Sequence, residues 1–149
     1  MSGSSTIRLG VCGLGNIAQK HIHNILNGSV AGLALTAVCS RTPSTFAESL
    51  NTEHFTCYET MIKSGRIDAI LIATPTYNHY EVGTAALKAG LHIMMEKPIG
   101  LSVAEGEKLV ALQQEEQIFG LMLNQRTDPL FLKIRDIVQT GSLGDIKRV

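Results

Sequence analysis

Short runs of apolar residues alternate along the chain with longer segments in which apolar residues recur every three or four positions. The short runs predict strands at residues 7–12, 35–39, 55–57, 68–73, 92–95 and 118–123. The longer segments predict helices at residues 16–27, 45–50, 77–89, 102–116 and 129–140. Strands that alternate with crossover helices predict an α/β fold with a doubly wound, mainly parallel sheet of the Rossmann type.

A glycine-rich turn follows the first predicted strand and leads into the first predicted helix. Its sequence, Gly13-Leu14-Gly15-Asn16-Ile17-Ala18, has the G-x-G-x-x-A spacing of dinucleotide-binding turns. Gly13 permits the tight turn, and Gly15 lets the backbone approach a pyrophosphate that the helix N-terminus attracts. The alternative is an ordinary strand-to-helix turn, which the flanking strand and helix make less favoured.

The second predicted strand ends in Ser40-Arg41-Thr42, where NAD-binding domains usually carry an acidic residue for the adenosine ribose. Without that carboxylate nothing repels a 2′-phosphate, and Arg41 can pair with one. The hypothesis is that NADP binds at least as well as NAD. In the alternative interpretation, Arg41 is a solvated loop charge.

Composition removes several other classes of protein. Thirteen basic residues balance thirteen acidic ones in the 149, which disfavours nucleic acid and membrane surfaces as partners. Cys12, Cys39 and Cys57 have no CxxC spacing, so we expect reduced, mostly buried thiols. The polar start at residues 1–6 has no signal-peptide pattern, and a cytoplasmic protein is expected. No His or Cys set has metal-ligand spacing, His21 and His23 included, so no metal is predicted.

Four motifs in order give the chain a family resemblance: GLGNIA at 13–18, ATPTYNH at 73–79, EKP at 96–98 and NQRTDP at 124–129. Together they resemble the Gfo/Idh/MocA family, which includes glucose-fructose oxidoreductase and inositol dehydrogenase. The resemblance implies an NAD- or NADP-dependent oxidoreductase that acts on the CH–OH group of a sugar or polyol. It also implies a homo-oligomer.

The resemblance implies a role for each matching residue. The pyrophosphate would meet Gly13, Gly15, Asn16 and Ile17, and the adenosine ribose would meet Ser40 and Arg41. The cofactor would be bordered by Thr74, Thr76 and His79, although the family usually has Asn at position 76.

At the other end of the cofactor, Glu96 and Lys97 would sit beside the nicotinamide ribose. Lys97 would be the catalytic lysine that assists proton transfer from the substrate hydroxyl, as alcohol oxidation requires. A cis Lys97–Pro98 bond is compatible with this motif. The alternative for Glu96 and Lys97 is a surface ion pair.

The expected domain organisation is a nucleotide-binding domain at 1–140, then a linker and the start of a second domain at 141–149, with a strand opening at 146–149. The family's second, α+β domain, which carries an Asp and a His for catalysis, has no counterpart in this sequence. A fragment, a natural truncation and a domain working with a partner chain all stay open, and we expect little turnover from this chain alone. Two other functions also remain: a non-catalytic nucleotide-binding or redox-sensing module, and a domain for another adenosine ligand.

Overall fold

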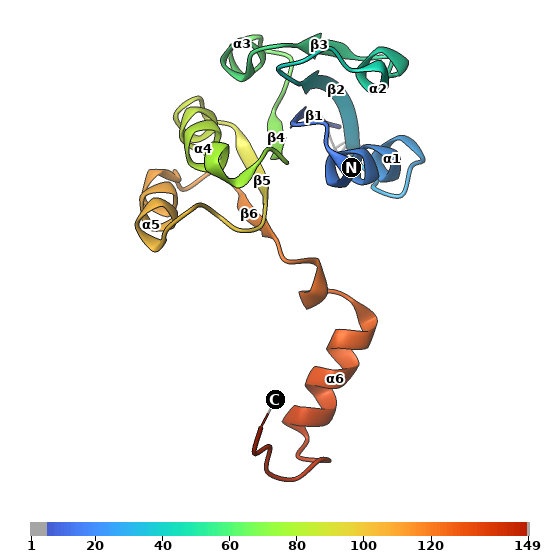
Figure 1. Cartoon of the computed structure of the whole chain (residues 1–149), viewed down its shortest axis with the longest axis vertical. Coiled ribbons are helices and arrows are strands. Elements are labelled where there is room, and N and C mark those ends of the chain that lie inside the picture. The colour runs from blue at the N-terminus through green and yellow to red at the C-terminus, as the bar shows by residue number, and fades with distance from the viewer. Residues whose placement is uncertain (1–5, 149) are drawn as a thin grey trace, which may run out of the picture.

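Six parallel strands form one sheet in the computed structural model, which describes residues 6–148 (Figure 1). The strands are β1 (Ile7–Cys12), β2 (Leu33–Cys39), β3 (Glu53–Phe55), β4 (Ala69–Ile72), β5 (His92–Glu96) and β6 (Phe119–Met122). Their spatial order is β3-β2-β1-β4-β5-β6, and every neighbouring pair is parallel. The chain therefore winds outward in both directions from the β1–β4 pair, as the alternation of strands and helices predicts.

Helices cover both faces of this sheet. The helices are α1 (Asn16–Leu26), α2 (Thr45–Ser49), α3 (Tyr58–Lys63), α4 (His79–Lys88), α5 (Val103–Leu112) and α6 (Pro129–Gln139), with 3-10 turns η1 (Thr76–Asn78) and η2 (Asn124–Arg126). One buried cluster joins α1 and α2 to alternate strand residues such as Val11 and Val38. The other cluster joins α3, α4 and α5 to the strand residues that alternate with these and point to the opposite face of the sheet, such as Ile70 and Met95. The predicted doubly wound Rossmann fold is confirmed.

Several predicted boundaries were wrong, each for a local reason. The third strand lies two residues earlier than predicted, because Cys57 is already the N-cap of helix α3, which the periodicity did not reveal. The helix predicted at 77–89 begins as η1 and becomes α-helical only at His79. Helix α5 ends at Leu112 instead of residue 116, because Gln113 has an extended backbone.

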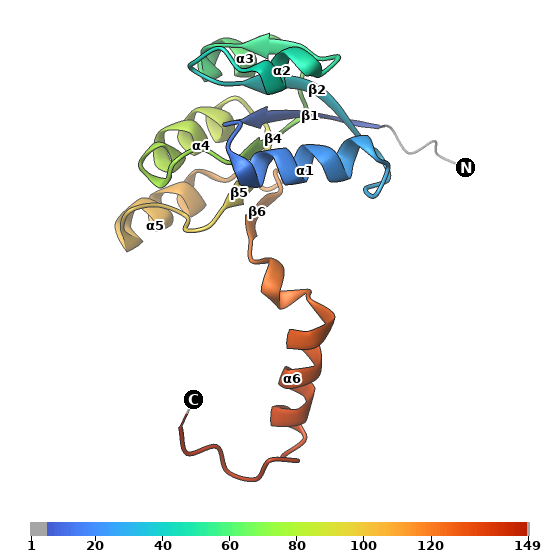
Figure 2. The same ribbon diagram turned by 45° about the vertical axis from the view of Figure 1, so that its right-hand side comes forward.

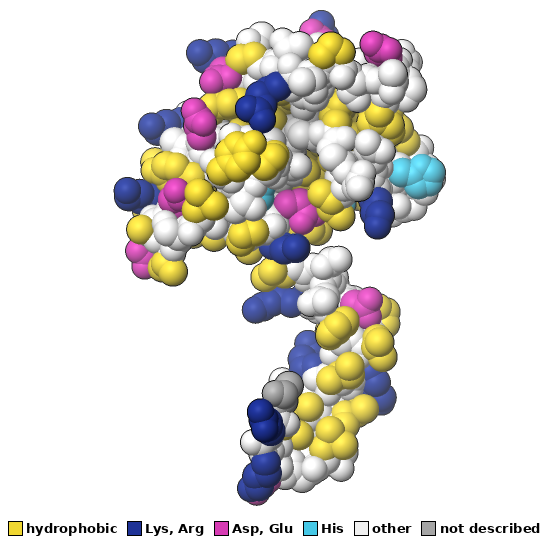
Figure 3. All heavy atoms as spheres, in the orientation of Figure 1, with side chains coloured by type: hydrophobic (Ala, Val, Ile, Leu, Met, Phe, Trp, Pro, Cys, Tyr) yellow, Lys and Arg dark blue, Asp and Glu magenta, His cyan; other side chains and the backbone are white. Residues whose placement is uncertain are grey.

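Helix α6 lies apart from the sheet in both ribbon views (Figures 1 and 2). None of its residues is buried among the described part of the chain, and apolar side chains line its surface in Figure 3. The strand predicted at 146–149 is absent from residues 146–148, and Val149 lies outside the described residues, as does most of the polar start at 1–6. No helix between residues 6 and 148 has the length and apolar character to cross a bilayer.

Candidate functional site

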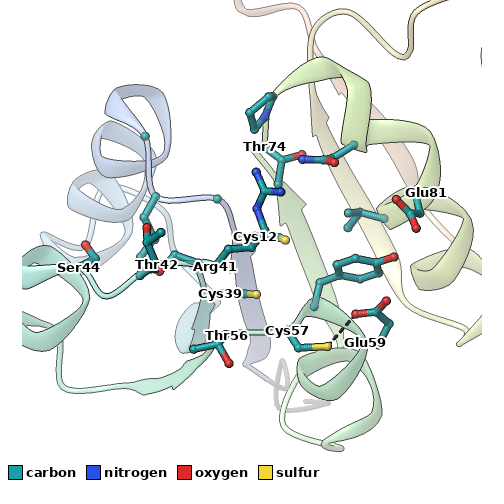
Figure 4. A pocket seen from close by; sticks show the side chains of 18 of the residues that line it. Cys12, Cys39, Arg41, Thr42, Ser44, Thr56, Cys57, Glu59, Thr74 and Glu81 are labelled. Carbon is teal, nitrogen blue, oxygen red and sulfur yellow. Dashed lines mark hydrogen bonds between the residues drawn. The ribbon is translucent and has the colours of Figure 1, made fainter.

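A cavity of about 660 Å³ opens at the carboxyl ends of β1, β2 and β4 (Figure 4). The strand order reverses at this point, since β1 is followed by β2 on one side and neighbours β4 on the other. In open α/β sheets such a switch point is where ligands bind, because the loops that leave neighbouring strands separate there. The cavity is lined by Cys12, Gly13, Leu14, Gly15, Cys39, residues 40–44, residues 56–59, Thr74, Pro75, Asn78, Glu81 and Val82.

Gly13 makes the turn at the floor of the cavity. Its φ of 91° lies in the left-handed region, and a Cβ there would come within 2.6 Å of the Ala73 carbonyl oxygen. Its N–H donates to the Cys39 carbonyl at 2.9 Å, which joins the ends of β1 and β2. Only glycine lets the turn pass this close to the end of β4.

Gly15 has the opposite environment. A Cβ on Gly15 would meet no atom within 4 Å, so the space beside it is open to a ligand. Gly15 is also the N-cap of α1, and no side chain in residues 6–148 caps this helix. Ser44, Ser102 and Asp128, by contrast, cap α2, α5 and α6. The amide end of α1 is thus available to an anion at the cavity, which suits a pyrophosphate.

Asn16 and Ile17 form the first turn of α1, and both are exposed. They do not line the cavity itself. They follow Gly15 directly, at the rim of the cavity, where their backbone N–H groups are in the first turn of α1.

Ser40 and Arg41 stand at the wall formed by the end of β2, as the sequence predicted for the adenosine end. The Ser40 hydroxyl donates to the Thr42 carbonyl at 2.8 Å and lies 2.9 Å from His54 Nε2. Ser40 therefore shapes the loop, since its hydroxyl is already engaged. The Arg41 guanidinium donates to the Tyr77 hydroxyl at 3.4 Å, which links the loop after β2 to η1.

Residues after β3 complete this wall of the cavity, and the sequence did not predict them. Cys57 Sγ donates to Glu59 Oε2 at 2.7 Å, and this hydrogen bond lowers the pKa of the Glu59 carboxyl (Figure 4). Burial, together with Glu59, raises the pKa of Tyr58. The rule that ligands meet carboxyl ends of strands would have found these residues if β3 had been predicted in its true position.

His79 lies behind the cavity wall, whereas the resemblance implies a place beside the cofactor. It is 1% exposed and does not line the cavity. Its Nδ1 lies 2.7 Å from the Pro98 carbonyl oxygen and its Nε2 lies 2.9 Å from the Thr74 carbonyl oxygen. The ring thus joins the loop after β4 to the loop after β5. Thr74 lines the cavity, whereas Thr76 begins η1 and does not.

Glu96 and Lys97 mark the carboxyl end of β5, beside β4 and outside the main cavity. Glu96 is 8% exposed, and its Oε1 lies 2.7 Å from His21 Nε2 on α1. His21, for which no function is predicted from the sequence, thus ties α1 to β5. Lys97 is exposed, and the Lys97–Pro98 bond is cis. The two neighbours therefore differ: Glu96 is held in place, whereas the Lys97 ammonium faces solvent.

The fourth motif lies elsewhere. Gln125 and Arg126 line a second hollow of about 480 Å³ with Phe131, Leu132 and Arg135 of α6. No set of three His, Cys, Asp or Glu side chains within residues 6–148 is arranged to hold a metal ion.

Known proteins match this chain over most of its length. The model of the "Oxidoreductase family, NAD-binding Rossmann fold", Gfo/Idh/MocA, matches residues 7–124. The chain is 30% identical to inositol 2-dehydrogenase of Corynebacterium glutamicum, over 96% of this chain and 44% of that protein. It is 33% identical to the uncharacterized oxidoreductase YrbE of Bacillus subtilis, over 91% of this chain and 40% of that protein.

A solved structure gives the same result. Scyllo-inositol dehydrogenase from Lactobacillus casei, with bound cofactor NAD(H) and scyllo-inositol, superposes with a TM-score of 0.86 at 30% identity. The match covers 95% of this chain and 43% of that one. The chain therefore spans less than half the length of these relatives, and it belongs to the Gfo/Idh/MocA oxidoreductase family as an NAD-binding Rossmann domain.

Proposed function

We propose that the cavity holds the adenosine half of NAD or NADP, with the pyrophosphate over the turn Gly13–Ile17. The observation that carries this proposal is the pairing of two glycines with opposite environments. Gly13 lies against β4 with no room for a side chain, and Gly15 leaves open space at an uncapped helix end. A diphosphate would accept hydrogen bonds from the first-turn amides of α1 and be stabilised by the helix dipole.

The nicotinamide end would then lie toward Glu96 and Lys97 at the end of β5. When bound, the nicotinamide supplies a hydride acceptor for the carbon of an alcohol. Lys97 would take part in removing the hydroxyl proton, because its amine is exposed on a loop held by His79 and by Glu96. Thr74 and Thr76 would line the path of the cofactor between the two ends.

The substrate class we propose is a sugar or polyol, on the strength of the inositol dehydrogenases among the relatives. These relatives are more than twice as long as the residues they share with this chain. Residues 1–140 would form the nucleotide-binding domain, and residues 141–149 would lead toward a substrate-binding domain that also makes a homo-oligomer. Purified 1–149 should therefore bind cofactor but turn over little inositol or glucose.

For the choice between coenzymes, we propose that NADP binds at least as well as NAD. The loop after β2 has no carboxylate, and Arg41 on this loop lines the cavity together with Glu59 of α3. The Arg41 guanidinium supplies the positive charge with which a 2′-phosphate would pair. Titrating wild type and Arg41→Ala with NADH and NADPH tests this. A clear preference for NADH that Arg41→Ala leaves unchanged would exclude the proposed role of Arg41.

Gly15→Val tests the cofactor site. A side chain there meets no protein atom, so the fold should persist, and it would fill the space of the pyrophosphate. We expect NADH affinity to fall at least tenfold, about 1.4 kcal/mol, in a fluorescence titration. The matched control is Asn24→Val on the exposed face of the same helix, which should bind as wild type. Equal affinity of Gly15→Val and Asn24→Val would refute the site.

A further inference from the structure

All three cysteines of the chain line the cavity, which their spacing in the sequence does not suggest. Cys12 is the last residue of β1 and Cys39 is the last residue of β2. Cys57 stands at the start of α3. Figure 4 shows Cys12 and Cys39 on adjoining strands, with Cys57 beyond them.

Cys12 and Cys39 are partners in the sheet register. Register partners on neighbouring strands lie about 4.8 Å apart and point to the same face of the sheet. Both residues belong to the same buried cluster, which confirms the shared face. Disulfides join residues with Cα atoms roughly 4.4–6.8 Å apart and Cβ atoms roughly 3.5–4.5 Å apart, so this pair is within reach of a bond once the ends of the two strands draw slightly together.

The two thiols are also chemically different. Both are nearly buried, at 3% and 4% exposed, and the cavity is their route to solvent. Interaction with Cys12 lowers the pKa of Cys39, whereas interaction with Cys39 and burial raise the pKa of Cys12. With Cys39 as the attacking thiol and Cys12 as the resolving thiol, the product is the same disulfide that the reverse order would give.

We propose that Cys12 and Cys39 form a peroxide-sensitive thiol pair whose disulfide is incompatible with tight dinucleotide binding. The inference rests on the proposed cofactor site, because both thiols lie on its floor. First, the Cys39 thiolate attacks a peroxide oxygen, the O–O bond breaks, and sulfenic acid and hydroxide form. Then the Cys12 sulfur attacks the Cys39 sulfur, the S–O bond breaks, and water leaves with the Cys12 proton. Each sulfur is oxidised by one electron and the peroxide is reduced by two.

The link to binding follows from what comes next in the chain. Cys12 precedes Gly13 and Cys39 precedes Ser40, so the pair joins the phosphate turn to the adenosine wall. A disulfide draws the two sulfurs to about 2.05 Å, well inside their contact distance. Gly13 has no room to follow this movement, since it already lies against Ala73. The turn therefore loses its shape for the pyrophosphate, and a bound nucleotide in turn covers both thiols.

The test uses residues 1–149 carrying Cys57→Ser, which leaves only the two thiols in question. After hydrogen peroxide treatment and alkylation, peptide mapping without reduction should find Cys12 linked to Cys39 in the monomer. After peroxide is removed, NADH affinity should be at least tenfold weaker and should return on treatment with dithiothreitol. NAD at ten times its Kd should slow the crosslinking about elevenfold, because only the empty fraction reacts.

The control is the same background with Cys39→Ser, in which peroxide should neither form the crosslink nor shift NADH affinity. Two free thiols after peroxide, or separate sulfinic acids, would refute the pair. A crosslinked chain that binds NADH with unchanged affinity would refute the coupling. A reduced chain that binds no NADH would instead overturn the proposed function. Mass spectrometry of the peptides would still show whether Cys12 and Cys39 are crosslinked, independently of NADH binding.

Discussion

The two edges of the sheet hold buried polar side chains of different kinds. Three polar residues are buried in the described chain, and the two ionisable ones, His79 and Glu96, lie at the carboxyl edge. The third, Gln117, lies at the amino edge and is a neutral amide. Its side chain donates to the carbonyls of Leu87 and Leu91, both at 2.9 Å. A neutral amide is enough to join the backbone segments at the amino edge. The buried ionisable groups lie at the carboxyl edge, beside the proposed cofactor site.

The charges of the amino edge are exposed. Arg8 and Asp68 form a bidentate pair of 2.6 and 3.0 Å, with side chains 46% and 40% exposed. Exposed pairs of this type contribute little to stability because water screens them. Substitutions at the carboxyl edge should therefore change both the free energy of unfolding and the affinity for NADH. Substitutions at the amino edge should change only the free energy of unfolding. Four substitutions test this difference.

His79→Phe should have the largest effect. The phenyl ring keeps the volume but removes the two ring nitrogens that face the Pro98 and Thr74 carbonyls, and with them the imidazole N–H that one of these carbonyls accepts, at a cost of about 3 kcal/mol. Both loops it joins border the proposed cofactor site, so NADH affinity should fall as well. Urea unfolding and NADH titration measure the two effects, with exposed His23→Phe on α1 as the matched control. Wild-type NADH affinity in His79→Phe would remove the functional difference between the edges.

Gln117→Leu should lower the free energy of unfolding by about 2 kcal/mol, because two carbonyls lose their shared donor. NADH affinity should stay within twofold of wild type, since the loop lies at the opposite edge from the cavity. Exposed Gln114→Leu on the same connection is the control for surface composition. A binding defect in Gln117→Leu equal to that of His79→Phe would mean that binding follows overall stability.

Glu96→Gln should cost about 1 kcal/mol, because an amide oxygen still faces His21 but the charge is gone. A double-mutant cycle with His21→Gln isolates the coupling between α1 and β5. Exposed Glu107→Gln on α5 is the matched control. Additive effects of the two substitutions would show that this pair does not join the helix to the strand.

Asp68→Asn should have the smallest effect, and it should depend on pH. Hydrogen bonds from Arg8 lower the pKa of Asp68 to about 2 from 3.8. A folded-state pKa below the unfolded value gives stability that is present above about pH 4 and lost as pH falls through 2. Urea unfolding of Asp68→Asn should therefore lose less stability than wild type between pH 4 and 2. Asp145→Asn, on an exposed loop, should keep the wild-type slope.

The fold could be predicted from sequence because its signals are local. Buried runs such as residues 69–72 and the helix stops at Gly90 and Gly141 are read from neighbouring residues alone. Short elements were harder, because three residues of β3 or six of α3 offer too few positions for a period to be recognised.

The site divides in the same way. The glycine turn was predictable, because a backbone that needs positive φ or close approach to a ligand requires glycine, and Gly13 and Gly15 stand at these positions in the sequence. The contact between His21 and Glu96 was not, since it joins residues 75 positions apart through the packing of α1 on the sheet. The place of His79 also depends on such a contact, with Pro98 on the following strand's loop. Contacts between side chains on different strands and helices can be identified only from the structure.

The isolation of α6 decides how these measurements must be read. The chain has three tyrosines and no tryptophan, and Tyr58, Tyr77 and Tyr80 lie in α3, η1 and α4. Intrinsic fluorescence therefore reports on the sheet and its helices, and it is silent about residues 129–139. Circular dichroism counts both parts, so an early gradual loss of ellipticity from α6 would precede the cooperative step that fluorescence follows. Disagreement between the two spectroscopies would map onto this one helix.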